Sequence, residues 1–221
     1  MLRVKICGNR TTEDIALAVA MGADAVGLIV GVRHRSEDAQ EPANAAILLR
    51  SVPIFVTSVL VTHLIAADQV IRLHATVPTT AIQLHDAIPV EAIEAIRTAL
   101  PHVPLIKAIG VTDVGSIETA YRFAPHVDAL LLDSHTTDRI GGTGRVHDWS
   151  ISRKIVATLQ IPVILAGGLR PENLIRAIEA VQPYAVDVNS GVEYSNGEKD
   201  PERLKEFVRL AKSHKEQRAP R

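Results

Sequence analysis

The sequence predicts a single α/β domain folded as an eight-stranded (β/α)8 barrel. Its 221 residues lie within the range of about 200 to 250 that one such barrel uses. Short β-branched runs recur roughly every 22 to 33 residues, and each is followed by turn residues and a segment of helical period. Hydrophobic residues make up 47% of the chain but aromatic ones only 3%, so the core must be aliphatic. We expect the barrel to span residues 1–212 and a polar tail to follow at 213–221.

Eight β-branched runs supply one strand each, with room between them for one helix and two loops. They are Arg3–Gly8, Ala25–Gly31, Phe55–Thr62, Thr80–His85, Pro104–Val111, Ala129–Ser134, Pro162–Gly168 and Ala185–Val192. Strict alternation of strands and helices also fits an open, doubly wound sheet. Such a sheet normally has fewer strands and often carries a G-x-G-x-x-G turn after the first, where this chain reads Cys7-Gly8-Asn9-Arg10. The closed barrel is therefore favoured.

Residues typical of helix N-termini occur between the predicted strands, where the barrel fold requires helices. Thr11-Thr12-Glu13-Asp14 offers a capping threonine and two carboxylates that suit a helix N-terminus. Pro171 and Pro201 each precede a glutamate and an apolar periodic run, which predicts the seventh and eighth helices. The second and sixth connections, 32–41 and 135–148, are longer than their neighbours and follow strand ends. Long loops in a compact domain are often functional.

The charge balance and the cysteine content exclude several classes of partner and site. The 24 basic and 25 acidic side chains give no electrostatic reason to expect nucleic acid or an anionic membrane. The lone Cys7 excludes an intramolecular disulfide and a multi-cysteine zinc site. No apolar run approaches the roughly 20 residues that span a bilayer, and the start lacks a signal-peptide pattern. We expect a cytoplasmic protein.

Glycine-bearing turns end the last two predicted strands. Active sites of this barrel lie at the C-terminal ends of the strands, where the loops after strands seven and eight often hold a phosphate on backbone N–H groups. Gly167 and Gly168 end strand seven, and Ser190 and Gly191 end strand eight. Gly142, in the run 141–144 of the sixth loop, adds amides to the same anion, forms a flap, or is only a flexible turn. Together these turns predict a phosphorylated ligand.

Cys7 ends the first strand immediately before a glycine. A lone cysteine is in general more often a small buried hydrophobe than a catalytic group. Its position instead predicts a side chain in the barrel mouth, where a nearby cation could favour the thiolate and make it a general base or a nucleophile. Lys5 shares its side-chain direction and would lie deeper as a structural cation.

Asp133 follows the apolar run 129–132, so its carboxyl would stand at the edge of an aliphatic core. Desolvation there raises a carboxyl pKa and suits the group to donating a proton. The structural alternative is an N-cap or a salt bridge to Lys107 on the neighbouring strand. Asp187 is a second inward candidate, which either organises the site or neutralises a buried lysine.

The nine histidines do not favour a metal site. His63 and His85 end strands, but no H-x-x-x-H or H-E-x-x-H spacing occurs. Metal catalysis is the weaker interpretation, and we expect neither a metal nor a cofactor. Other polar residues at strand ends are Gln83 beside His85, and Arg33 with Arg35.

Seven motifs spread from residue 4 to residue 193 resemble the phosphoribosylanthranilate isomerases of tryptophan biosynthesis. They are Val4-Lys5-Ile6-Cys7-Gly8, Gly22-Ala23-Asp24-Ala25-Val26-Gly27, Ile82-Gln83-Leu84-His85, Leu131-Leu132-Asp133, Gly141-Gly142-Thr143-Gly144 with Asp148-Trp149, Ala166-Gly167-Gly168-Leu169-Arg170-Pro171-Glu172-Asn173, and Ala185-Val186-Asp187-Val188-Asn189-Ser190-Gly191-Val192-Glu193. Such an ordered set is far more specific than any single glycine turn.

The resemblance implies a cofactor-free Amadori rearrangement of N-(5-phosphoribosyl)anthranilate to 1-(2-carboxyphenylamino)-1-deoxyribulose 5-phosphate. By motif, Asp133 is the general acid that opens the ribose ring and Cys7 the general base that removes the C2 proton. The phosphate would lie on the amides of the glycine turns, helped by Gly142. Substrate-binding candidates are Lys5, Arg33, Arg35, Gln83, His85 and Asp187.

Departures from the family pattern cluster where the aromatic end of the substrate should lie. The family usually carries Ser-x-Arg after strand two, where this chain reads Val32-Arg33-His34-Arg35. We favour Arg35, with Arg33 as the alternative, for the anthranilate carboxylate. Asp86 replaces a usual glycine, and His147 a common phenylalanine. Two other hypotheses are the same scaffold acting on another phosphorylated aminoaldose, and a non-catalytic sugar-phosphate sensor. A monomer and a homodimer both remain open.

Overall fold

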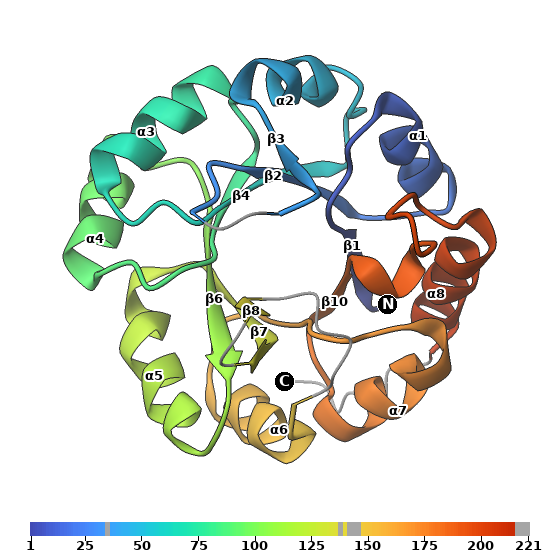
Figure 1. Ribbon diagram of the computed structural model, residues 1–221. Helices are drawn as coiled ribbons and strands as arrows, with labels where there is room; N and C mark the ends of the chain where they lie inside the picture. The colour runs from blue at the N-terminus through green and yellow to red at the C-terminus, as the bar shows by residue number, and fades with distance from the viewer. Residues whose placement is uncertain (34–35, 137–138, 141–146, 215–221) are drawn as a thin grey trace.

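A computed structural model describes residues 1–33, 36–136, 139–140 and 147–214 and has the predicted closed parallel barrel (Figure 1). Eight parallel strands form the ring, because β1 pairs with both β2 and β10. In ring order they are β1 (Arg3–Ile6), β2 (Ala25–Val30), β4 (Thr57–Thr62), β5 (Ala81–Leu84), β6 (Leu105–Val111), β7 (Ala129–Thr136), β9 (Val163–Leu165) and β10 (Ala185–Val188). Each predicted strand is confirmed as an element, with differences at its ends.

Helices surround the barrel, as Figure 1 shows. They are α1 (Thr12–Ala20), α2 (Pro42–Leu49), α3 (Ala67–Thr76), α4 (Val90–Ala99), α5 (Gly115–Phe123), α6 (Trp149–Thr158), α7 (Pro171–Val181) and α8 (Pro201–Ser213), with the 3-10 turn η1 (Ala124–His126). Thr11 caps α1 by accepting the Asp14 N–H, and prolines open α7 and α8 as predicted. The proposed tail at 213–221 is described only through residue 214, since 215–221 lie outside the described residues.

The chain after the last barrel strand differs from the prediction. Strand eight was expected to run to Val192, but β10 ends at Val188 and Ser190–Val192 form the 3-10 turn η2. The Asn189 carbonyl accepts the Val192 N–H in this turn. The two long loops also carry short unpredicted strands. β3 (Ala39–Gln40) pairs with β2, and β8 (Arg139–Ile140) pairs antiparallel with β7.

The barrel interior and the layer between barrel and helices are separate apolar regions. Small and branched side chains such as Val59, Ala81, Ala108, Leu131 and Ile164 fill the interior, and a larger cluster packs between strands and helices. Because both faces of each strand are buried, the strand sequences are nearly continuous apolar runs. In the part of the chain that the structure describes, no helix is both long and apolar enough to cross a membrane.

Candidate active site

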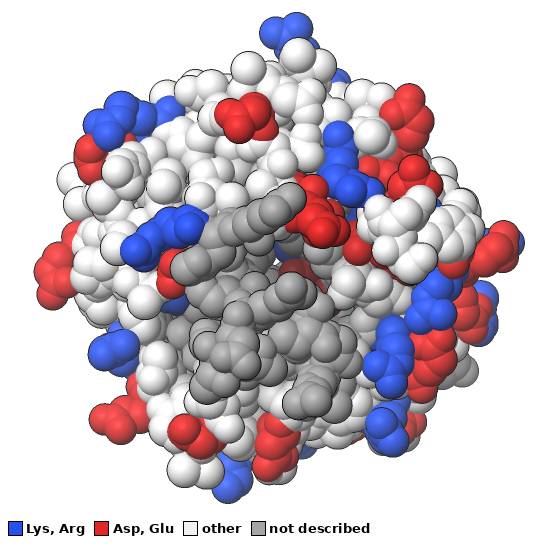
Figure 2. Space-filling view, in the orientation of Figure 1, with Lys and Arg blue, Asp and Glu red and all other residues white. Residues whose placement is uncertain are grey.

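The C-terminal ends of the barrel strands bring ionisable side chains from opposite ends of the sequence together. Lys5 lies on β1 and Cys7 directly follows it, while Asp187 comes from β10 and Asp133 from β7. Lys5 is in register with Asp187 on the adjacent strand, so both side chains enter the same interior. Acidic and basic side chains are interspersed around this face of the molecule (Figure 2).

A buried ion pair lies at the bottom of the mouth. Lys5 Nζ is 2.9 Å from Asp187 Oδ2, and the two side chains are only 4% and 8% exposed. Burial lowers the pKa of Lys5, but Asp187 and Cys7 more than offset this, so its pKa is raised overall and the ammonium persists. Asp187 Oδ1 and Gln83 Oε1 are buried and have no hydrogen-bond partner among the described residues. These acceptors are positioned for a polar ligand.

Asp133 has an unusually basic carboxyl. Burial, with the nearby charge of Asp187, raises its pKa to about 7, against smaller opposing effects of the Ser134 amide and Lys5. The Ser134 N–H donates to Asp133 Oδ1 at 2.7 Å. Near neutral pH this group can therefore hold and release a proton.

Cys7 is buried against the same ion pair. Burial raises the pKa of its thiol, and the charges of Lys5 and Lys199 only partly compensate. The sequence had suggested that a nearby cation would favour the thiolate; the cation is present, but desolvation outweighs it. Space here depends on Gly27, because a Cβ at that position would lie 2.8 Å from Cys7 Sγ and 3.2 Å from Lys5 Nζ.

His85 directly follows β5 and faces Asp133. Its Nε2 is 3.7 Å from Asp133 Oδ2, and its ring stacks on His63 with centroids 5.0 Å apart. The Gln83 amide nitrogen lies 3.0 Å from His85 Nδ1 and can only donate to it. The proton of a neutral His85 ring is therefore on Nε2, toward Asp133.

The two glycine turns after β9 and β10 lie against each other. Gly167 and Gly168 have left-handed φ angles of 79° and 66°. A Cβ on Gly191 would lie 1.8 Å from the Leu169 carbonyl oxygen, so only glycine permits this approach. Within the described part of the chain, the amides of Gly167, Gly168, Ser190 and Gly191 donate no hydrogen bond. Free amides on adjoining turns are an arrangement that commonly binds anions in proteins.

A buried polar cluster beside these turns was not predicted from the sequence. Lys199 Nζ donates to Asn189 Oδ1 at 2.7 Å and to Glu193 Oε1 at 2.6 Å. The Asn189 amide then donates to Asp38 Oδ2 in the second loop, at 2.7 Å. The cluster thus joins the second loop to η2. The Asn-Ser-Gly motif was the available signal, but nothing in the sequence connected it with Lys199.

The predicted substrate arginines are only partly described. Arg33 Nη1 lies 3.5 Å from Asp86 Oδ2. Arg33, one of the two candidate carboxylate-binding arginines, is therefore paired with the aspartate that departs from the family pattern. Arg35 and Gly142 lie outside the described residues. His147 bonds to Ser134 and Ser152, and burial lowers its pKa to about 4, so it is a neutral hydrogen-bonding residue.

Lys107 does not pair with Asp133, contrary to the structural alternative considered for that carboxyl. Its strand neighbours Ile106 and Ala108 face the interior, so Lys107 points outward between β6 and the helices. Among the described residues, no group of three or more His, Cys, Asp or Glu side chains is arranged to hold a metal.

Fold and site together define a (β/α)8-barrel protein with ionisable side chains and two adjoining glycine turns in its mouth. The family model for N-(5'-phosphoribosyl)anthranilate isomerase matches residues 4–210. The chain belongs to this family, and is thus an enzyme of the aldose–ketose isomerase class.

Relatives match over nearly the whole chain. The second N-(5'-phosphoribosyl)anthranilate isomerase of Methanosarcina mazei is 42% identical over 214 residues, which are 96% of this chain and 95% of the relative. A phosphoribosylanthranilate isomerase crystallised with reduced 1-(o-carboxyphenylamino)-1-deoxyribulose 5-phosphate is 34% identical, with a TM-score of 0.83 over 97% of this chain and all of that one. Monomers generated from the dimeric Thermotoga maritima enzyme give 32% identity and a TM-score of 0.82, with the same coverage.

Proposed function

We propose that this chain isomerises N-(5-phosphoribosyl)anthranilate to 1-(2-carboxyphenylamino)-1-deoxyribulose 5-phosphate in tryptophan biosynthesis, with Asp133 as general acid and Cys7 as general base. The observation that carries the proposal is the carboxyl of Asp133, whose pKa burial raises to about 7 beside the same Lys5–Asp187 pair that borders the Cys7 thiol. Membership of the family supplies the substrate.

The first step is opening of the ribose ring. Asp133 donates its proton to the ring oxygen, the bond from that oxygen to C1 breaks, and the nitrogen lone pair forms a protonated Schiff base. His85 Nε2 faces the other side of the carboxyl and orients it. A neutral acid is needed here, and a pKa near 7 maintains a useful fraction of it at neutral pH.

The second step moves a proton from C2. Cys7, as thiolate, removes this proton, and the electron pair forms an enolamine that tautomerises to the aminoketose. The thiol is protonated in the unliganded protein, since burial raises its pKa. The positive Schiff base formed in the first step favours the thiolate by direct charge attraction.

The two ends of the substrate require different partners. The phosphate is proposed to lie on the amides of Gly167, Gly168, Ser190 and Gly191, which form no internal hydrogen bonds in the described part of the chain. The anthranilate carboxylate is assigned to Arg35. Arg33 is the less suitable candidate because Asp86 already neutralises it.

Loss of substrate fluorescence tests the proposal. Wild-type protein should convert the anthranilate substrate, while Cys7→Ala and Asp133→Asn should each lower kcat by a factor of about 10³ or more. Turnover absent from the folded wild type, or full activity in Cys7→Ala, would contradict the assignment. Sedimentation of the same samples distinguishes the monomer from the homodimer.

A further inference from the structure

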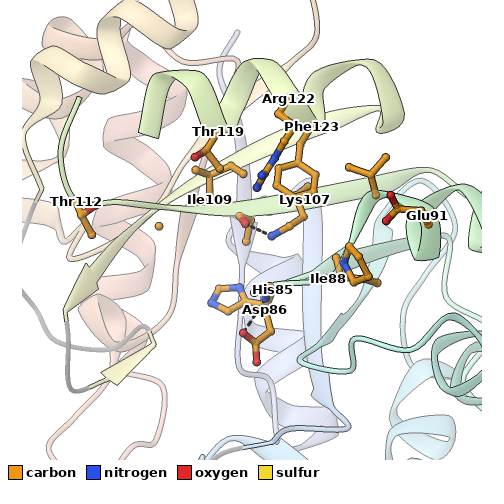
Figure 3. A pocket seen from close by; sticks show the side chains of 15 residues that line it. His85, Asp86, Ile88, Glu91, Lys107, Ile109, Thr112, Thr119, Arg122 and Phe123 are labelled. Atoms are coloured by element: carbon orange, nitrogen blue, oxygen red, sulfur yellow. Dashed lines mark hydrogen bonds between the residues drawn. The ribbon is translucent and has the colours of Figure 1, made fainter. Parts of the chain in front are cut away.

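Outside the barrel mouth, β6, α4 and α5 enclose a cavity of about 620 Å³ that the proposed reaction does not use, the α4–α5 cavity. Figure 3 shows Lys107 pointing into this region from β6, beneath Phe123 and Arg122 of α5. The β5–α4 segment around Ile88 forms the opposite wall. His85 and Asp86 lie where the cavity approaches the mouth.

Lys107 is an unusual side chain for such a place. It is only 4% exposed, and among the described residues it has no carboxylate ion-pair partner. Its ammonium donates to the Ala108 carbonyl and lies 5.2 Å from the centre of the Phe123 ring. Neither contact is with a carboxylate, and a buried ammonium with no directly paired carboxylate is energetically costly.

The charged groups around Lys107 favour a ligand that carries a single negative charge. Asp86 is an acidic group whose charge raises the pKa of Lys107, but its Oδ2 also lies 3.5 Å from Arg33 Nη1. Arg122 lies over the outer side of Phe123, 4.8 Å from the ring centre. Glu91 is exposed at the rim. Arg122 also lines the cavity, and its charge lowers the pKa of Lys107. A single carboxylate on Lys107 balances that ammonium without placing a second negative charge beside Asp86 and Glu91.

We propose that the α4–α5 cavity binds a small organic monocarboxylate, with its carboxylate on Lys107 and its apolar body against Ile88, Ile109 and Phe123. Apolar walls around one charged group are the usual design of a small-molecule site. Desolvation lowers the pKa of Lys107 to about 8 in the unliganded protein, so the lysine is still mostly charged at neutral pH. A bound carboxylate supplies the missing counter-ion and reverses part of that shift.

Benzoate is a suitable probe because it joins one carboxylate to a flat apolar ring. Nuclear magnetic resonance of protein with isotope-labelled lysine side chains reports on Lys107 directly. We expect saturable binding with a Kd of about 1 to 10 mM, typical of so small a ligand. Benzoate should raise the pKa of Lys107 from about 8 toward its ordinary value.

Variants separate this cavity from the barrel mouth. Lys107→Met keeps the length of the side chain and removes its charge, so benzoate affinity should fall at least about tenfold. Lys154→Met on the exposed face of α6 is the matched control and should bind like wild type.

Three results would overturn the proposal. They are no saturable binding up to about 50 mM benzoate, equal affinity in wild type and Lys107→Met, and a Lys107 titration that benzoate does not move. Tighter binding of inorganic phosphate than of benzoate at this lysine would contradict the choice of a monocarboxylate.

Discussion

One ion pair shifts the pKa of both proposed catalytic groups. The Lys5–Asp187 pair is 2.9 Å long, and both of its charges act on Asp133 and on Cys7. Asp187 raises the pKa of the carboxyl and of the thiol, whereas Lys5 lowers both. Replacement of either partner should therefore move both titrations in the same direction.

The pH dependence of kcat/KM should be bell-shaped. The productive form has Asp133 protonated and Cys7 ionised, although Asp133 titrates near 7 and Cys7 above its ordinary value of 9.0. This form is a small but constant fraction of the protein between the two pKa values. Activity should rise through about pH 7 and fall above pH 9. Steady-state rates across this range provide the check, and a profile that falls through pH 7 would contradict the assignment.

Asp187→Asn should shift both limbs of this profile to lower pH. Loss of the carboxylate removes a charge that raises the pKa of Asp133 and of Cys7, and it leaves Lys5 free to lower both. Positions of the limbs, not the height of the curve, are the measurement. Asp68→Asn on the surface of α3 is the control and should leave the profile in place. A shift to higher pH in Asp187→Asn would refute this account.

Gly27→Ala tests the space around the thiol. The added Cβ would lie 2.8 Å from Cys7 Sγ, so the thiol must move. We expect kcat to fall at least about tenfold with a loss of stability of about 1 to 3 kcal/mol. The control is Gly22→Ala, which introduces strain at a φ of 95° but whose Cβ would only touch Val208 at 3.7 Å. That variant should lose stability without losing activity, as kinetics and thermal unfolding will show.

At the scale of elements, the turns after β9 and β10 act as one unit. Asn173 of α7 accepts the Arg170 N–H and donates to the Gly168 carbonyl, which fixes the first turn on its helix. Gly191 then lets the second turn touch Leu169. The proposed phosphate site therefore depends on the start of α7 and on one close backbone approach.

Gly191→Ala should separate these turns. A Cβ only 1.8 Å from the Leu169 carbonyl oxygen cannot be accommodated without backbone movement. Because the phosphate does not react, we expect KM to rise at least about tenfold with a smaller change in kcat. Inhibition by inorganic phosphate should weaken in parallel. An unchanged KM in a folded variant would show that the phosphate binds elsewhere.

Sequence periodicity predicted all eight barrel strands but could not orient each one. Lys5 and Cys7 share a face because they are two residues apart, and the structure agrees. A salt bridge from Lys107 to Asp133 was one structural alternative, and it is wrong because Lys107 faces outward. Both faces of β6 are apolar, so the sequence does not show which residues face inward. The turn η2 and the Lys199–Asn189 contact were not predicted, because they depend on tertiary packing and not on a repeating sequence pattern.

At the scale of the whole molecule, the buried carboxylate of Asp133 lowers the stability of the folded protein when it is ionised. The pKa of Asp133 is raised from 3.8 to about 7 on folding, so its contribution is most favourable below pH 3.8 and is lost as pH rises through 7. Above pH 7 the cost is at most about 4 kcal/mol.

Asp133→Asn should therefore be more stable than wild type at pH 8 and close to it at pH 4. The neutral amide keeps the shape of the carboxyl without its buried charge. We expect a gain in Tm at pH 8 of several degrees, up to about 10 °C, measured by calorimetry at both values of pH. A variant that is less stable than wild type at pH 8 would show that the charge is well solvated in the folded protein.

The most direct test is a crystal structure of this protein with reduced 1-(o-carboxyphenylamino)-1-deoxyribulose 5-phosphate, which is already bound in a related structure. The account predicts Cys7 Sγ against C2, Asp133 against the former ring oxygen, and the phosphate on the amides of Gly168, Ser190 and Gly191. A ligand bound with its phosphate away from these turns, or with C2 out of reach of Cys7, would contradict it.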